Sequence, residues 1–174
     1  MFTVFAYGSL MHPDDIEETF GSDVVCETCL LSGFKRHYGQ RSEWRTNDDG
    51  EKAGVLTVSP SHSKNGKNKS YCNGVLIRNI EDNVYKKYQE RETGYELVGI
   101  PSSSFDLCEN SKEKTTEYVT VPIGAWRMNE WNPLESYMKH CEEGARHWGT
   151  KFYQLFCRTT YQTGFSEVLP HPMN

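Results

Sequence analysis

Residues 2–10 have the sequence FTVFAYGSL, in which a short apolar run changes abruptly into a glycine-serine turn. Residues 2–7 have the apolar, β-prone composition of a buried strand. Gly8 allows a sharp turn and lets a ligand approach the bare backbone. Residues 12–16, HPDDI, predict the start of a helix, because a proline near the first position and acids in the first turn are typical start signals.

Strand, loop and helix start together form a unit that can bind an anion. Backbone N–H groups from Ser9 onward can point outward, and the first helical turn adds further donors. Such donors would hold a carboxylate or a phosphate. An ordinary tight turn after an edge strand explains Tyr7-Gly8-Ser9-Leu10 equally well, so both interpretations stay open on these residues alone.

Length and composition fit one compact domain over residues 1–174, with 13% aromatic residues to fill a core. The formal net charge of −5 argues against nucleic acid or an anionic membrane as the partner, so a small molecule is the better candidate. The sequence shows no secretory signal and no apolar run of transmembrane length. We therefore expect a soluble, cytoplasmic protein.

Six cysteines are spread along the chain, and only Cys26 and Cys29 have the spacing of a metal or redox motif. No second close cysteine pair and no histidine pair completes a zinc site with them. We expect reduced, mostly structural thiols and a protein that needs neither a metal nor another cofactor. A redox role of this pair stays open.

Residues 34–45, FKRHYGQRSEWR, combine basic and aromatic side chains. In another context this composition would indicate nucleic-acid binding, but the acidic total favours a solvated strand or loop face. Residues 53–58 and 72–77 predict two further strands. The polar segment 59–70 between them predicts a hairpin loop with no chemistry of its own.

A second informative stretch covers residues 79–100. Asn79 can cap a helix that ends near Glu92, since Gly94 is a typical stop signal, and residues 95–100 then predict a strand. The apolar residues near one face of this helix are Ile80, Val84, Tyr85 and Tyr88.

Glu90, Arg91 and Glu92 occupy the last turn of this helix. The helix dipole disfavours negative charge there, and burial would raise the pKa of a carboxyl group further. One of the two acids could therefore act as a general base near neutral pH. Both could equally be surface acids in an ordinary charged turn.

Residues 91–95, RETGY, resemble the Arg-Glu-x-Gly-Tyr motif of the γ-glutamylcyclotransferase superfamily (AIG2-like and ChaC-like proteins), especially its ChaC-type branch. The strand and Tyr-Gly-Ser loop of residues 2–10 resemble the opening of the same family, and Gly74-Val75 resembles the strand that precedes the second motif. Residues 34–45 are similar to the ChaC-type region that leads to Arg and Ser residues beside the pocket. The resemblance is best over residues 2–100.

Toward the C-terminus, residues 132–135, NPLE, predict a helix start with Asn132 as the cap. The helical stripe that follows predicts core packing, and we assign it no ligand role. Its members are Leu134, Tyr137, Met138, Cys141, Ala145 and Trp148. Gly149 ends this helix, and a second helical segment follows it.

The resemblance implies an α+β fold, namely a small mixed β-barrel of five or six strands with flanking helices. It also implies an enzyme that releases 5-oxoproline from a γ-glutamyl amino acid, a peptide such as glutathione, or an amine, with Glu92 as the catalytic acid/base. The residues expected to bind this small-molecule substrate are Tyr7, Gly8, Ser9, Leu10 and Tyr95. The alternative is a non-catalytic member that keeps the pocket as a metabolite-binding or interaction module.

Overall fold

The computed structural model describes residues 1–61, 70–107, 116–125 and 132–162. The elements, in chain order, are β1 (Phe2–Ala6), the 3-10 turn η1 (Ser9–Met11), α1 (Pro13–Phe20), β2 (Val25–Ser32), β3 (Phe34–Thr46), β4 (Lys52–Pro60), β5 (Tyr71–Ile80), α2 (Asp82–Arg91), β6 (Tyr95–Pro101), η2 (Ser102–Ser104), β7 (Phe105–Leu107), β8 (Tyr118–Gly124), α3 (Glu135–His147), α4 (Thr150–Thr159) and β9 (Thr160–Tyr161).

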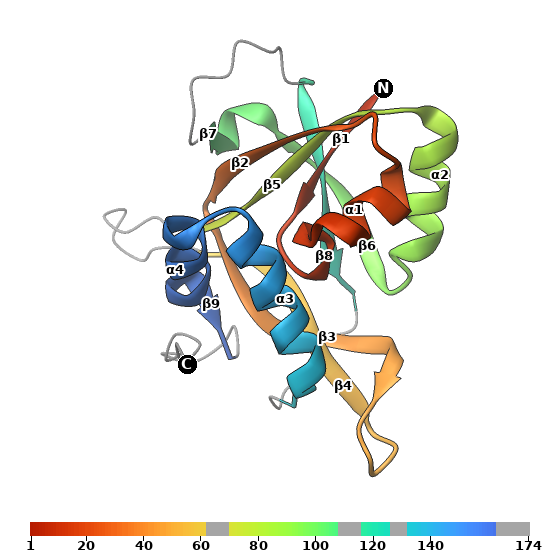
Figure 1. Cartoon of the computed structure of the whole chain (residues 1–174), viewed down its shortest axis with the longest axis vertical. Helices are drawn as coiled ribbons and strands as arrows, with labels where there is room; N and C mark the ends of the chain where they lie inside the picture. Colours follow the sequence, from red (N-terminus) through yellow and green to blue (C-terminus); the bar gives the residue numbers. More distant parts are fainter. Residues whose placement is uncertain (62–69, 108–115, 126–131, 163–174) are drawn as a thin grey trace.

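The described strands form two sheets (Figure 1). The larger has the order β6-β8-β1-β5-β2-β7, and the smaller has the order β4-β3-β9. Within the larger sheet, β1 pairs antiparallel with β5 and parallel with β8. The predicted α+β class is therefore confirmed, although the strands described do not close into one barrel.

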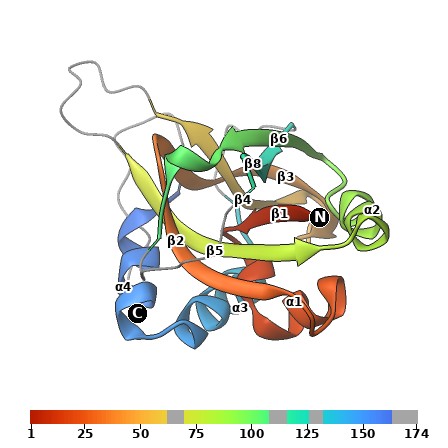
Figure 2. The same ribbon diagram turned by 90° about the horizontal axis from the view of Figure 1, so that it is seen from above.

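Side chains rather than a strand ladder connect the two sheets. The Gly124 N–H of β8 donates to Thr57 Oγ1 of β4 at 2.8 Å, and Gln40 Nε2 of β3 donates to the Gly94 carbonyl at 2.9 Å. Figure 2 shows the larger sheet from above, with α3 and α4 on one side and α2 at one end. The two sheets thus meet near the start of β6, where the candidate site lies.

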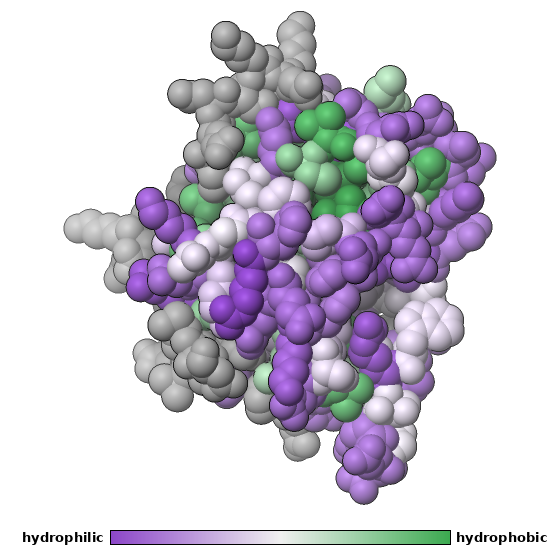
Figure 3. Space-filling model, viewed as in Figure 1, coloured by the Kyte–Doolittle hydropathy of each residue, from purple (hydrophilic) through white to green (hydrophobic). Residues whose placement is uncertain are grey.

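The helices pack on a continuous core that includes the fully buried Phe5, Leu76 and Tyr88. Phe20 of α1 contacts Tyr88 of α2, with their ring centroids 5.4 Å apart. On the face drawn in Figure 3, hydrophilic residues cover most of the surface and hydrophobic ones gather in a smaller group near the top. Within the described ranges, no helix is both long and apolar enough to cross a membrane.

The prediction of a solvated face for residues 34–45 is wrong for the first half of β3, where Arg36, His37, Tyr38 and Gln40 are buried. The Arg36 guanidinium is fully enclosed, but its N–H groups have acceptors, because Nη2 donates to Asn73 Oδ1 at 2.9 Å and Nε donates to Thr160 Oγ1 at 2.8 Å. Burial of a cation is tolerable when its donors are satisfied in this way. Composition alone did not indicate these partners.

Two expected helix caps are also wrong. Asn79 belongs to β5 with a φ of 62°, and α2 starts later, with Glu81 at its N-cap. Leu134 occupies the N-cap of α3. Asn132 instead joins β4, since its carbonyl accepts from Gly54 N at 3.2 Å and its Nδ2 donates to the Lys52 carbonyl at 3.2 Å. The expected hairpin loop of 59–70 falls largely on residues 62–69, which lie outside the described residues.

Candidate active site

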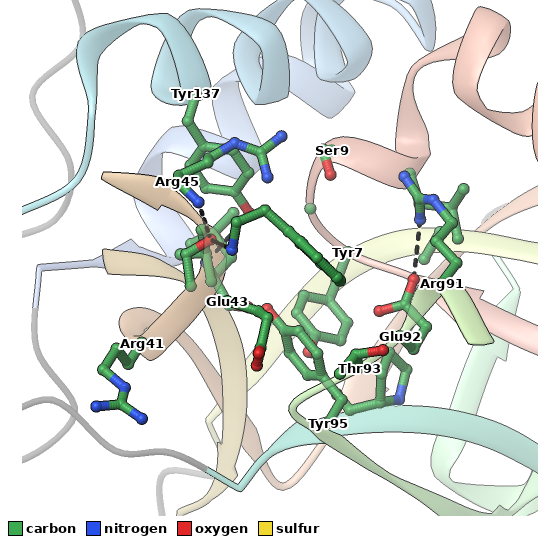
Figure 4. A pocket seen from close by; sticks show the side chains of 18 of the residues that line it. Tyr7, Ser9, Arg41, Glu43, Arg45, Arg91, Glu92, Thr93, Tyr95 and Tyr137 are labelled. Atoms are coloured by element: carbon green, nitrogen blue, oxygen red, sulfur yellow. Dashed lines mark hydrogen bonds and ion pairs between the residues drawn. The ribbon is translucent and has the colours of Figure 1, made fainter. Parts of the chain in front are cut away.

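A cavity of about 280 Å³ lies between the loop after β1, the second half of β3 and the end of α2 (Figure 4). All six residues that the sequence singled out line this cavity, namely Tyr7, Gly8, Ser9, Leu10, Glu92 and Tyr95. They come from two segments far apart in the chain, which the pairing of β1 and β6 with β8 brings into one sheet. Their chemical roles remain predictions.

The loop after β1 closes through backbone bonds. Met11 N donates to the Gly8 carbonyl and His12 N to the Ser9 carbonyl, both at 3.0 Å. The N–H groups of Gly8, Ser9 and Leu10 precede these donors and have no acceptor within the turn, as at the start of any helix. Leu10 is buried and also lines the cavity.

Gly8 does not occupy the left-handed backbone region. Its φ of −130° is open to any residue. A Cβ on Gly8 would lie 3.4 Å from the Tyr137 hydroxyl oxygen and 3.5 Å from Leu56 Cβ. These are ordinary van der Waals distances. The turn itself is made by the 3-10 residues that follow Gly8, and the approach of a ligand to its backbone remains a prediction.

Glu92 is the C-cap residue of α2, and only 11% of its side chain is exposed. Arg91 Nη1 donates to Glu92 Oε1 at 2.8 Å, as the dashed line in Figure 4 shows. Burial raises the pKa of the Glu92 carboxyl above its ordinary value, and the Arg91 guanidinium offsets part of this rise. Glu90, by contrast, is exposed and lies outside the cavity lining.

Three tyrosines shape the inner wall, of which Tyr7 and Tyr137 are buried and Tyr95 is half-buried. Tyr7 donates to the Pro122 carbonyl, and Tyr95 donates to the Leu56 carbonyl at 2.7 Å. The Tyr137 hydroxyl accepts from Leu56 N at 3.2 Å. Burial raises the pKa of all three hydroxyls, so they are neutral at physiological pH. They form a fixed, uncharged wall between the loop and β4.

The side of the cavity opposite Glu92 comes from the second half of β3, which contributes residues 41–45. Ser42 Oγ accepts from Trp44 N at 3.2 Å and Arg45 N at 2.9 Å, at a register irregularity of the β3–β4 ladder. Figure 4 shows Arg45 on the Tyr137 side of the cavity, and its guanidinium lies 4.8 Å from the centroid of that ring. Trp44 is 71% exposed at the rim.

Sequence reasoning missed Tyr137, because its helical spacing fits core packing equally well. It is indeed buried, at 6% exposure, but its hydroxyl reaches the cavity. The Arg and Ser residues implied beside the pocket correspond in position to Arg41, Ser42 and Arg45. The mixture of charges in residues 41–45 was the sequence feature that could have indicated a cavity edge. On composition alone it was interpreted as a solvated face.

The residues that could hold a metal lie elsewhere. Cys26 and Cys29 are three apart in β2 and so point to opposite faces of the sheet, and burial raises the pKa of the Cys26 thiol to about 11. The five described cysteines form no disulfide with one another, and Cys108 lies outside the described residues. In the described ranges, one group of three potential metal ligands is found, made of His12, Asp15 and His140.

No protein-family model and no curated protein matches the sequence. Solved structures do match. One described as "Gamma-glutamyl cyclotransferase" aligns with a TM-score of 0.63 at 16% identity over 95% of this chain and 94% of that one. A human structure described as uncharacterized protein loc79017 aligns with a TM-score of 0.60 at 18% identity over 95% and 94%.

A yeast γ-glutamyl cyclotransferase described as specific to glutathione aligns with a TM-score of 0.59 at 15% identity, over 91% of this chain and 96% of that one. These alignments cover almost the whole chain at low identity, so they concern the arrangement of the elements. The chain therefore has the fold of the γ-glutamyl cyclotransferases.

Proposed function

We propose that the protein is a γ-glutamylcyclotransferase that releases 5-oxoproline from a γ-glutamyl compound. The observation that carries this proposal is the position of Glu92, a carboxyl group 11% exposed in a cavity that is also lined by the loop after β1. The fold shared with γ-glutamyl cyclotransferases supports the same reaction class.

The proposed reaction is intramolecular aminolysis. The α-amine nitrogen of the γ-glutamyl group attacks its own γ-carbonyl carbon, and a new C–N bond closes the five-membered ring. The original bond from that carbon to the leaving amine then breaks. The α-ammonium group first loses one proton, which frees the amine to attack, and a second proton passes from the same nitrogen to the leaving amine as the lactam forms. A single carboxylate can accept and return that second proton. Glu92 is assigned this role.

The loop residues are assigned to substrate binding. The N–H groups of Gly8, Ser9 and Leu10 would hold the substrate α-carboxylate, since N–H groups at the start of a helical turn favour anions. Tyr7 and Tyr95 would form the wall that bends the substrate toward ring closure. Such orientation can lower a barrier by several kcal/mol (roughly 7–11 in well-aligned intramolecular cases).

The β3 side of the cavity is assigned to binding the leaving amine. It carries both a cation, Arg45, and an exposed aromatic ring, Trp44. The group presented to this side differs among a γ-glutamyl amino acid, glutathione and a γ-glutamylamine. The assay below decides which of these compounds is the substrate.

The test is to incubate the pure protein with glutathione, several γ-glutamyl amino acids and γ-glutamyl-lysine, and to quantify 5-oxoproline by chromatography. Release from at least one substrate, and its loss in Glu92→Gln, is expected. Absence of 5-oxoproline from every substrate, together with saturable binding of one of them, would instead support the non-catalytic binding module.

A further inference from the structure

Outside the cavity, His12, Asp15 and His140 come together where η1 and the start of α1 meet α3. His140 Nε2 lies 3.1 Å from Asp15 Oδ1, and the rings of His12 and His140 stack with centroids 4.6 Å apart. One ligand atom from each of the three residues lies within 4.8 Å of the other two. The proposed reaction uses none of these groups.

The close packing of η1 on α3 positions this cluster. A Cβ on Gly144 of α3 would lie only 2.8 Å from His12 N, so glycine is what permits the approach. Trp148 Nε1, from the end of α3, donates to the Met11 carbonyl at 2.9 Å. These contacts hold the backbone at His12 next to α3, so the cluster needs only side-chain movement to close around an ion.

The ligand types and spacing suit a zinc-class cation. Zinc binds His nitrogen at about 2.0–2.1 Å and carboxylate oxygen at about 2.0–2.2 Å in tetrahedral geometry, which places ligand atoms roughly 3.3 Å apart. The 3.1 Å separation of His140 Nε2 and Asp15 Oδ1 already fits this spacing. The His12 ring must move closer, which changes its stack on His140 and gives up a long 3.3 Å cap bond from Asp14 N.

The surroundings also resemble those of a metal ligand set. Arg91 Nη2 lies 3.3 Å from Asp15 Oδ2, so the second carboxylate oxygen has its own donor while Oδ1 is available to a metal. The side chains of His12 and Asp15 are each 21% exposed and that of His140 is 34% exposed, which leaves an entry path.

We propose that His12, Asp15 and His140 bind one divalent transition-metal ion of the zinc class, with a fourth position left to water. The site joins the start of α1 to α3, beside the loop that forms one edge of the cavity. No metal takes part in the proposed reaction, although Arg91 links the two sites, because its guanidinium contacts both Asp15 and Glu92.

The test is calorimetric titration of untagged full-length protein with zinc chloride at neutral pH, with thermal unfolding measured in parallel. One zinc ion per chain is expected. Because a ligand that binds only the folded state stabilises it, zinc at a hundredfold excess over its dissociation constant should raise Tm by roughly 5–10 °C. His140→Ala and Asp15→Asn should each weaken binding at least about tenfold and, at the same zinc concentration, reduce the Tm rise to about half or less.

His147→Ala is the matched control, since His147 is an exposed histidine on the same helix outside the cluster. Cys26→Ser controls for thiol binding. Both variants should bind zinc as the wild type does. Circular dichroism verifies that the variants are folded. If His140→Ala does not fold, Asp15→Asn alone tests the cluster. Failure of the wild type to bind zinc, or binding that survives both cluster variants, would overturn the proposal.

Discussion

The loop edge of the cavity and its β3 edge differ in how the chain builds them. The loop edge consists of consecutive residues, 7–10, whose turn is closed by two local backbone bonds. The β3 edge depends on a register irregularity in a long ladder and on Tyr137, which arrives from α3. A cavity edge built from consecutive residues can be predicted from a short sequence motif. An edge assembled by tertiary contacts cannot.

The largest expected effect concerns Glu92, which lines the same cavity as the loop edge. Glu92→Gln keeps shape and hydrogen-bonding capacity but cannot exchange a proton, so 5-oxoproline release should fall by about 10²- to 10⁴-fold. Initial rates and circular dichroism measure the loss and verify the fold.

Glu90→Gln is the matched control for this experiment, because Glu90 has the same chemistry two residues away but is exposed outside the cavity lining. It should keep nearly full activity. If Glu90→Gln abolished release and Glu92→Gln did not, the motif would be assigned to the wrong acid. If neither mattered, the proton transfer proposed here would not occur in this protein.

The next effect tests the loop edge itself. In Gly8→Val, the new side chain would start 3.4 Å from the Tyr137 hydroxyl oxygen and extend over the backbone donors. KM should rise by roughly tenfold or more while the fold persists, since the charge-assisted hydrogen bonds that it would disturb are each worth about 1.5–3 kcal/mol.

Gly99→Val is the control for this change, because Gly99 lies on exposed β6 and a Cβ there meets nothing closer than 3.6 Å. Its KM should match that of the wild type. An unchanged KM in Gly8→Val would remove the loop from the binding site.

These two edges also explain how far sequence reasoning reached. The segment from β1 to α1 and the end of α2 were predicted almost residue by residue, because turn, cap and stop signals act over a few positions. The burial of Arg36 was not, since its acceptors Asn73 and Thr160 are distant in the chain. Two sheets instead of one barrel is a difference of the same kind, because strand pairing is a long-range property.

A third, smaller effect is expected in the pH profile. Burial raises the pKa of Glu92 and Arg91 opposes the rise, so the ionised base should be lost, as pH falls, at a pH above the ordinary value for a glutamate. Arg91→Gln removes the opposing charge and should shift this acid limb of kcat/KM to still higher pH. A shift to lower pH, or none, would contradict the assigned coupling.

The β3 edge is tested by stability rather than rate. Tyr137→Phe deletes the oxygen that accepts from Leu56 N, which should cost about 1–2 kcal/mol of unfolding free energy in urea titrations. Tyr118→Phe, at a residue 55% exposed, should change stability by less than about 0.5 kcal/mol. Equal stability of the two variants would show that Tyr137 does not hold β4 in place at the cavity.

The last prediction is an unchanged rate of 5-oxoproline release. It distinguishes the role of the cavity from that of the cluster of His12, Asp15 and His140. Both edges of the cavity offer amides, hydroxyls, a guanidinium and a carboxyl group, which suffice for a proton transfer between two amines. Exhaustive chelation should therefore leave the rate of 5-oxoproline release unchanged, even where it lowers Tm by removing a metal from the cluster. The two measurements on the same sample test this, with Cys26→Ser excluding the thiols as the metal source. Loss of release on chelation, with recovery when zinc is added, would place a metal in the reaction and contradict the mechanism assigned to Glu92.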